Sequence, residues 1–301
     1  MNETVLITGI TGRSGNYFLQ QLEIKGGIDN DNYRVIVRPT SDTKFIDESK
    51  LSIEKVVGNL DDLFFLSQVT IGIDTILHIA GIHWSLNIVK TAIQNNVKRL
   101  ILVHTTGIYS KYKEASAEYR QIENEISSLV IGRDISLTIL RPTMIYGSLD
   151  DSNIIIFIKM VDKLRVFPVV DHARFGLQPV HQKDLGKAYY QVLANPISTR
   201  NKNYDLSGAY PIDLIDILKT ISESLQKKTR FISIPFPIAY FGACIIYYLS
   251  LSKKDYREKV QRLVEIRVFE HKEATIDFEY NPIDFREGLK NEVELYIKGK
   301  R

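Results

Sequence analysis

The chain has 301 residues, of which 44% are hydrophobic and 25% charged, an ordinary composition for a globular protein. Its net charge of +3 gives no reason to expect a nucleic-acid partner, which would call for a clustered basic face. The single cysteine, Cys244, excludes an internal disulfide, and the histidines lack metal-ligand spacing, so we expect no metal site. The first apolar run, Val5–Ile7, is too short for a signal peptide, and we expect a reducing, cytoplasmic location.

The first 150 residues alternate short apolar runs with longer amphipathic stretches. The runs are rich in Val, Ile and Leu without strict alternation, which is typical of strands covered on both faces. Strand–helix alternation of this kind predicts a doubly wound, parallel α/β sheet. The predicted strands are 5–8, 34–38, 54–57, 75–80, 100–104 and 137–140, and the predicted helices are 12–25, 61–69, 85–95 and 116–130.

After residue 150 the pattern is looser. We expect helices at 153–161, 181–194, 212–225 and 284–297, an extended segment at 175–180 and a strand at 204–206. No low-complexity linker separates the two parts, so we expect interleaved lobes. Residues 1–150, with a returning segment 176–206, would form the first domain, and residues 151–175 and 207–301 a smaller second lobe.

One segment, 231–252, carries no charge and is bracketed by basic residues. Pro235 and Pro237 near its start predict that a helix begins around Pro237. The remaining 238–251 would span about 21 Å at 1.5 Å per residue, short of the ~30 Å hydrocarbon core of a bilayer. We expect a buried helix or the face of a homodimer, with membrane contact as the less favoured alternative.

The segment Thr8-Gly9-Ile10-Thr11-Gly12-Arg13-Ser14-Gly15 follows the first strand and opens the first helix. Gly9 would allow the tight turn, Gly12 the approach of a pyrophosphate, and Gly15 close packing of helix on sheet. The N-terminus of the helix then offers free N–H groups and a positive dipole to phosphates. The pattern predicts a dinucleotide-binding turn whose contact residues are Gly9, Thr11, Gly12, Arg13, Ser14 and Gly15.

The end of the second strand indicates which cofactor is bound. NAD binders place an acid there for the ribose 2′-hydroxyl, whereas NADP binders supply Arg. This chain has Arg38 and no acid until Asp42, and Arg13 is a second cation within the turn. NADP(H) is therefore favoured, with NAD(H) as the alternative.

Several further motifs occur in a fixed order. They are Gly58-Asn59-Leu60-Asp61, Leu77-His78-Ile79-Ala80-Gly81, Leu102–Tyr109, Leu140-Arg141-Pro142 through Gly147, Pro179–Leu185 and Tyr280-Asn281-Pro282. Together they resemble the extended short-chain dehydrogenase/reductase family, which includes NAD-dependent epimerases, dehydratases and reductases. The resemblance implies a doubly wound parallel Rossmann sheet with a smaller C-terminal substrate-binding lobe. It also implies cofactor contacts from Asn59, Leu60, Ala80, Gly81 and Pro142.

The family's chemistry implies a Ser or Thr that orients a substrate oxygen and a Tyr-x-x-x-Lys pair that handles the proton. Thr105 matches the Ser/Thr, and Tyr119 is the tyrosine on the following helix. Glu123 stands where the lysine is expected, so we assign Thr105, Tyr119 and Glu123 to catalysis with an altered motif. A literal Tyr109–Lys113 match lies too early to be on that helix.

An ionised Glu123 one turn from Tyr119 should raise the tyrosine's pKa. The protonated tyrosine could still donate to a ketone oxygen but would be a poor base for alcohol oxidation, so ketone reduction is the family reaction that survives this change best. The alternative for Tyr119 is a core aromatic, because it shares a helical face with Ile122 and Ile126. The expected function is an NADP(H)-dependent oxidoreductase or isomerase acting on a nucleotide-activated sugar or similar ketone. The alternative is an NADP(H)-binding redox sensor or assembly subunit without hydride chemistry.

Overall fold

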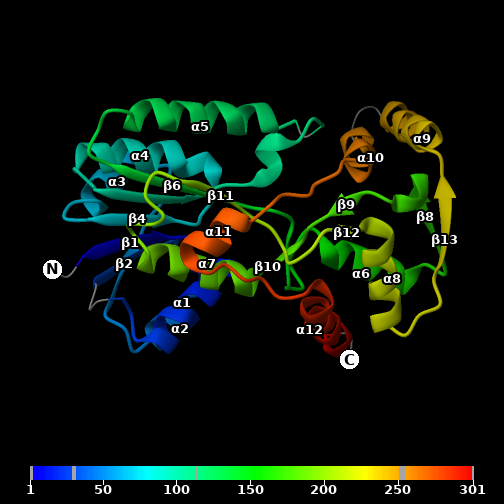
Figure 1. The fold of residues 1–301 in the computed structure, drawn as a ribbon, viewed down its shortest axis with the longest axis horizontal. Coiled ribbons are helices and arrows are strands. Elements are labelled where there is room, and N and C mark those ends of the chain that lie inside the picture. Colours follow the sequence, from blue (N-terminus) through cyan, green and yellow to red (C-terminus); the bar gives the residue numbers. More distant parts are fainter. Residues whose placement is uncertain (1–2, 29–31, 113, 251–254, 300–301) are drawn as a thin grey trace.

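A seven-stranded, fully parallel sheet forms the centre of the computed structural model, which describes residues 3–28, 32–112, 114–250 and 255–299. The strand order is β11-β6-β5-β4-β1-β2-β3, and Figure 1 shows the sheet between two helical layers. The predicted α/β class is therefore confirmed. The strands are β1 (Thr4–Thr8), β2 (Asn32–Val37), β3 (Ile53–Val57), β4 (Thr75–His78), β5 (Arg99–Val103), β6 (Ser136–Pro142) and β11 (Asn203–Leu206).

Both faces of the sheet are apolar, which explains the lack of alternation in the sequence. On β1, Val5 and Ile7 belong to one buried cluster, while Leu6 belongs to another. The first cluster includes side chains of α1 (Arg13–Lys25) and α7 (Gln182–Ala194). The second cluster lies under α3 (Leu63–Val69), α4 (Ser85–Gln94) and α5 (Ser116–Val130). These three helices form the layer at the top of Figure 1.

A third apolar cluster lies beyond the carboxyl end of the sheet. Its side chains come from α6 (Ile154–Lys163), α8 (Leu214–Ser224), α12 (Phe285–Lys298) and a small parallel pair of strands. That pair, β8 (Val166–Val170) with β13 (Arg230–Ile234), was not predicted. The other short elements are β7 (Ile145–Tyr146), β9 (Gly176–Leu177), β10 (Val180–His181), β12 (Ile212–Asp213), α2 (Lys44–Asp47), α10 (Arg257–Leu263), α11 (Lys272–Phe278) and 3₁₀ turns at Ile82–Trp84, Thr106–Tyr109 and Asp171–Ala173.

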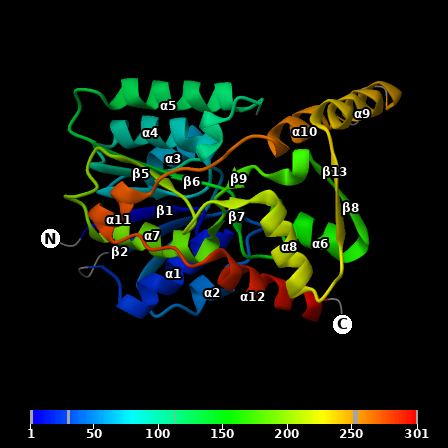
Figure 2. The same cartoon turned by 45° about the vertical axis from the view of Figure 1, so that its right-hand side comes forward.

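The uncharged segment forms β13 and then α9 (Phe236–Leu249), so the helix begins one residue before the predicted Pro237. The expectation that this helix is buried within the chain is wrong, because Ala243 is its only buried residue. Figure 2 shows α9 projecting from the body of the molecule. Residues 251 and 252 of the segment lie outside the described residues, and no helix among the described residues is long and apolar enough to cross a membrane.

Candidate active site

The turn after β1 can be built only with glycine at two positions. Gly9 has φ +77°, and a Cβ there would lie 2.6 Å from the backbone nitrogen of Ala80. A Cβ on Gly15 would lie 2.4 Å from the Gly9 carbonyl oxygen. Gly12 donates its N–H to the same carbonyl at 2.9 Å. The turn is therefore held tightly against β4, as the glycine spacing predicts.

The N-terminus of α1 fits an anionic ligand. Its N-cap, Gly12, provides no side-chain cap, and the first turn contains no acidic residue. The backbone N–H groups of this turn therefore keep their positive potential, as a phosphate group requires. A cavity of about 950 Å³ opens directly in front of them. Nine of the predicted cofactor residues line it: Gly9, Thr11, Gly12, Arg13, Ser14, Arg38, Asn59, Leu60 and Ala80.

Three predicted cofactor residues lie behind the cavity wall instead. Gly15 is the packing position described above. Gly81 has φ +114°, and its carbonyl is within hydrogen-bond distance of His78 Nε2, at 2.9 Å. The Pro142 carbonyl accepts a hydrogen bond from Thr106 Oγ1 at 3.2 Å. These residues shape the wall rather than line it.

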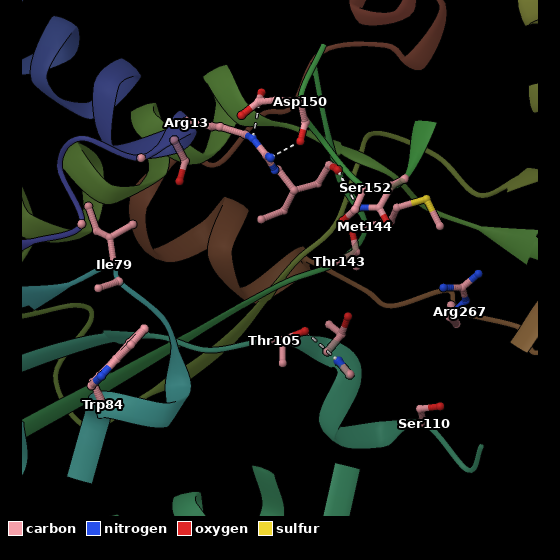
Figure 3. A pocket seen from close by; sticks show the side chains of 18 of the residues that line it. Arg13, Ile79, Trp84, Thr105, Ser110, Thr143, Met144, Asp150, Ser152 and Arg267 are labelled. Carbon is pink, nitrogen blue, oxygen red and sulfur yellow. Dashed lines mark hydrogen bonds and ion pairs between the residues drawn. The ribbon is translucent and has the colours of Figure 1, made fainter. Parts of the chain in front are cut away.

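The two arginines near the turn differ in their partners. Arg13 forms an ion pair with Asp150 (Nε–Oδ1 3.1 Å) and also donates to the Asp150 carbonyl, as Figure 3 shows. Arg38 is exposed, and it forms no ion pair within the described ranges. Arg38 is therefore the cation at this end of the cavity that is available to a charged ligand.

Thr105 lies on the cavity wall just beyond β5. Its hydroxyl accepts a hydrogen bond from the backbone N–H of Gly107 at 3.0 Å and so begins the following 3₁₀ turn. Figure 3 places Thr105 between the Arg13 end of the cavity and the end that holds Ser110 and Arg267. The predicted site residue is therefore within reach of a ligand that extends from the phosphate turn.

Directly behind Thr105 lies a buried polar network. Glu123 accepts from His104 Nδ1 at 2.9 Å and from Arg141 through both carboxylate oxygens, at 2.9 and 2.5 Å. Burial lowers the pKa of His104, so the ring is neutral at pH 7. Its Nδ1–H therefore faces the carboxylate, and its Nε2 accepts from the Ser85 hydroxyl at 3.0 Å. The network fixes the residue that immediately precedes Thr105.

The charge state of Glu123 follows from the same contacts. Burial acts to raise its pKa, but hydrogen bonds from His104 and Arg141 outweigh burial and lower the pKa to about 2. The carboxylate is thus ionised, and it is directed into the core. Glu123 does not line the cavity.

Tyr119 is buried, and it also does not line the cavity. Its ring packs edge-on against His83, with centroids 5.5 Å apart. Its pKa is raised, as expected, but the cause is different: burial acts first and the Glu118 charge second, and Glu123 does not contribute. Tyr119 belongs to the apolar cluster under α5, together with Ile122, which agrees with the core-aromatic alternative.

Tyr109 does line the cavity, unlike Tyr119. Its hydroxyl donates to Asp205 Oδ1 at 3.2 Å, and the Arg141 guanidinium lies 5.8 Å from its ring centre. Burial raises the pKa of Tyr109, so the phenol carries its proton at neutral pH. Lys113, the other half of the literal motif, lies outside the described residues.

The far end of the cavity is closed by residues 265–269, which connect α10 to α11. Glu265 accepts from the Ser110 hydroxyl at 2.8 Å and from the Lys111 N–H at 2.8 Å. The Phe269 N–H donates to Gln178 Oε1 at 3.2 Å, and the Phe269 ring packs on the Tyr109 ring. These contacts hold residues 265–269, called the strap below, against the segments that follow the strands of the sheet.

Arg267 is the residue of this strap that the sequence analysis missed. Its backbone N–H donates to the Gly176 carbonyl at 2.8 Å, which turns its side chain to the cavity. Its Nε is buried without a hydrogen-bond partner in the described chain, and burial lowers its pKa to about 10. A second arginine, Arg262, lines the same end. No local pattern distinguishes Arg267 from other arginines, because its position depends on the pairing with β9.

The parallel sheet, the glycine turn and the uncapped helix together define a Rossmann-type dinucleotide-binding protein. A model of the family described as NAD(P)H-binding matches residues 9–165, more than half of the chain, and the chain belongs to this family. This agrees with the resemblance to the extended short-chain dehydrogenase/reductases that the motifs indicate. No curated protein matches the chain significantly.

Solved structures share the fold over almost the entire chain. One is gox2253, at 19% identity and TM-score 0.78, covering 100% of this chain and 99% of that chain. Another is the UDP-glucose 4-epimerase of Thermotoga maritima, at 15% identity and TM-score 0.72, covering 99% and 100%. A third is the dTDP-glucose 4,6-dehydratase DesIV of Streptomyces venezuelae with NAD and TYD bound, at 16% identity and TM-score 0.71, covering 99% and 98%.

Proposed function

We propose that the protein is an NADP(H)-dependent oxidoreductase or isomerase acting on a nucleotide-activated sugar or a similar ketone. The observation that carries the proposal is the continuity of one cavity, which runs from the glycine turn past Thr105 to a second cationic end at Arg262 and Arg267. A dinucleotide would occupy the first part and a substrate the second. The first domain, 1–150 with 176–206, would hold the cofactor, and the lobe of residues 151–175 and 207–301 the substrate.

The preference for NADP(H) rests on Arg38. Its guanidinium is free of ion pairs within the described ranges and lines the cavity beyond β2, where the adenosine ribose lies in such folds. Arg13 would contribute only after exchanging its Asp150 partner for a phosphate. The 2′-phosphate of NADP(H) would thus be the natural partner of Arg38.

The substrate class is supported by the charge at the far end. Arg267 is half-buried, and its Nε is buried without a hydrogen-bond partner in the described chain, which favours a ligand that brings negative charge and hydrogen-bond acceptors. A nucleoside diphosphate linked to a sugar supplies both. The structural relatives above include an epimerase and a dehydratase whose names specify UDP-glucose and dTDP-glucose.

A bound nicotinamide would supply or accept a hydride, and the protein's own residues would position the substrate and move the proton. The Thr105 hydroxyl would orient the substrate oxygen from the cavity wall. Tyr109 lines the cavity and Tyr119 does not, so we propose Tyr109 as the proton donor, with Tyr119 as the alternative that the family motif indicates. Both phenols have raised pKa values, so each keeps its proton and could still donate it to a ketone oxygen, whereas neither would readily form the phenolate base that alcohol oxidation requires.

Glu123 would take a positioning role in this scheme. Its carboxylate holds His104 and Arg141 rather than facing the substrate. His104 precedes Thr105 directly, and Arg141 lies near the Tyr109 ring. Loss of Glu123 should therefore disturb the positions of the two cavity residues, Thr105 and Tyr109.

The test is NADPH consumption across a panel of keto-sugar nucleotides and small ketones. Tyr109→Phe and Tyr119→Phe form a matched pair, since each removes one hydroxyl from a raised-pKa tyrosine. Loss of turnover in one variant, with unchanged NADPH binding, would identify the donor. Full turnover by both would show that neither tyrosine is the donor. NADPH binding without reduction of any panel member would favour the redox-sensor or assembly-subunit alternative.

A further inference from the structure

Trp84 lines the cavity, and the proposed function gives it no role. It is the only tryptophan of the chain, and it ends the 3₁₀ turn that follows β4. The residue is half-buried, and within the described ranges it belongs to none of the three apolar clusters and does not pack against them. The apolar surface of the indole therefore forms part of the cavity wall rather than part of a core.

A hydrogen bond sets the direction of the indole. Its Nε1–H donates to Asp61 Oδ1 at 3.0 Å. Asp61 follows β3 and Trp84 follows β4, and in the sheet β1 and β2 lie between these two strands. Thr105 follows β5, on the other side of β4. The indole is thus directed toward the β2–β3 half of the cavity and away from Thr105, and in Figure 3 Trp84 lies on the side opposite Arg267.

The acceptor of this hydrogen bond is itself held in place. The Asp61 N–H donates to Asn59 Oδ1 at 3.2 Å. The Asn87 side chain of α4 donates to the Leu60 carbonyl at 3.1 Å. These contacts fix the loop after β3, so the indole is oriented before any ligand arrives. A preorganised wall of this kind costs little to order on binding.

The neighbours of Trp84 indicate what it would contact. The same half of the cavity is lined by Arg38 and Ser41 after β2 and by Leu60 after β3. With the adenosine ribose beside Arg38, the adenine would lie between these two loops. A flat, uncharged aromatic base is the part of a dinucleotide that gains most from an indole face.

We infer that Trp84 stacks on the adenine of the bound dinucleotide and that Asp61 positions the indole for this contact. The inference rests on the cofactor-binding part of the proposed function and is independent of the hydride chemistry.

The first test is calorimetric titration with ADP-ribose, which contains the adenine and the pyrophosphate but no nicotinamide. Trp84→Ala should weaken binding by about 5–150-fold, the scale of base–aromatic stacking. Trp84→Phe keeps an aromatic face and should lose only a small part of that affinity. Tyr210→Ala, at a 71% exposed position outside the cavity, is the control and should bind like the wild type.

The positioning role of Asp61 has its own pair of variants. Asp61→Ala removes the acceptor and leaves the indole in place, so ADP-ribose should bind more weakly than to the wild type. Asp61→Asn keeps an oxygen acceptor at the same position and should restore the affinity. Equal affinities of wild type and Asp61→Ala would contradict the positioning role.

Comparison of the two cofactors separates the base from the 2′-phosphate. NADPH and NADH share the adenine, so Trp84→Ala should weaken both by the same factor, whereas Arg38→Ala should weaken NADPH alone. A loss in Trp84→Ala that is confined to NADPH would overturn the assignment to the adenine.

Intrinsic fluorescence reports the contact directly, because Trp84 is the only tryptophan. ADP-ribose does not absorb where an indole emits, so a change in emission requires contact with the ring. We expect quenching that saturates with the calorimetric dissociation constant. Constant emission while ADP-ribose binds, or unchanged affinity in a Trp84→Ala variant that is folded by circular dichroism, would overturn the inference and leave the proposed function intact. A wild type that binds none of ADP-ribose, NADPH and NADH would overturn both.

Discussion

Replacement of Glu123 by Ala should destabilise the protein strongly. The carboxylate is 6% exposed and serves two partners, and removing one member of a buried pair typically costs about 3–5 kcal/mol. The pKa supports the same magnitude: a fall from 4.5 to about 2, at 1.36 kcal/mol per pKa unit, corresponds to roughly 3 kcal/mol. The melting temperature should fall by roughly 5–10 °C.

The pH dependence of this effect has a definite sign. Because the folded-state pKa of Glu123 is lowered, its stabilising contribution is complete above pH 4.5 and is lost as the pH falls toward 2. The difference in melting temperature between wild type and Glu123→Ala should therefore be largest near neutral pH and should shrink in acid. Glu123→Gln keeps the shape of the side chain, so its melting temperature should lie between those of the wild type and Glu123→Ala.

A matched control exists on the same helix. Glu125 forms an exposed ion pair with Lys90 at 3.5 Å, and Glu125→Ala should change stability by less than about 1 kcal/mol. Thermal unfolding followed by circular dichroism measures all three variants. Equal, small effects of Glu123→Ala and Glu125→Ala would refute the assignment of a buried, ionised network behind Thr105.

Three further predictions concern the cavity and its surroundings. Gly12→Val should abolish NADPH binding in a fluorescence titration, because a branched side chain would occupy the space that the pyrophosphate requires; unchanged affinity in a folded variant would mean that the turn is only structural. Arg38→Ala should remove most of a 10–150-fold preference for NADPH over NADH, about 1.5–3 kcal/mol, and equal affinities of the wild type would refute the assignment. Burial first, and then Asp151, raise the pKa of Glu292 to about 9, so its contribution to stability is present below pH 4.5 and is lost as the pH rises toward 9. Glu292→Gln stays neutral and should raise the melting temperature at pH 8, and a decrease there would contradict the raised pKa of Glu292.

Much of the fold could be predicted because its signals are local. The strands β1, β2 and β5 each contain at least three consecutive apolar residues, at 5–7, 35–37 and 100–103, and α5 has the predicted bounds, 116–130. The glycine turn was predictable for the same reason, since three residues and their spacing specify it. The strands β8 and β13 were missed, because β8 is interrupted by Pro168, and all of β13 except Arg230 lies in the uncharged segment that also contains α9.

The catalytic part of the site depends on contacts that are distant in sequence. Glu123 is one helical turn from Tyr119, which suggested that the two interact. In the fold its carboxylate instead reaches His104 and Arg141, which are 19 and 18 residues away. Arg267 reaches the cavity only because its backbone pairs with β9. Spacing along one helix cannot reveal either arrangement.

The central claim is that a single cavity places a nicotinamide cofactor beside Thr105. The measurement that tests it most directly is a crystal structure of the protein with NADPH. We expect the pyrophosphate at the first turn of α1, the 2′-phosphate beside Arg38, and nicotinamide C4 facing the Thr105 side chain. A cofactor bound elsewhere, or a nicotinamide ring directed away from Thr105, would contradict the account.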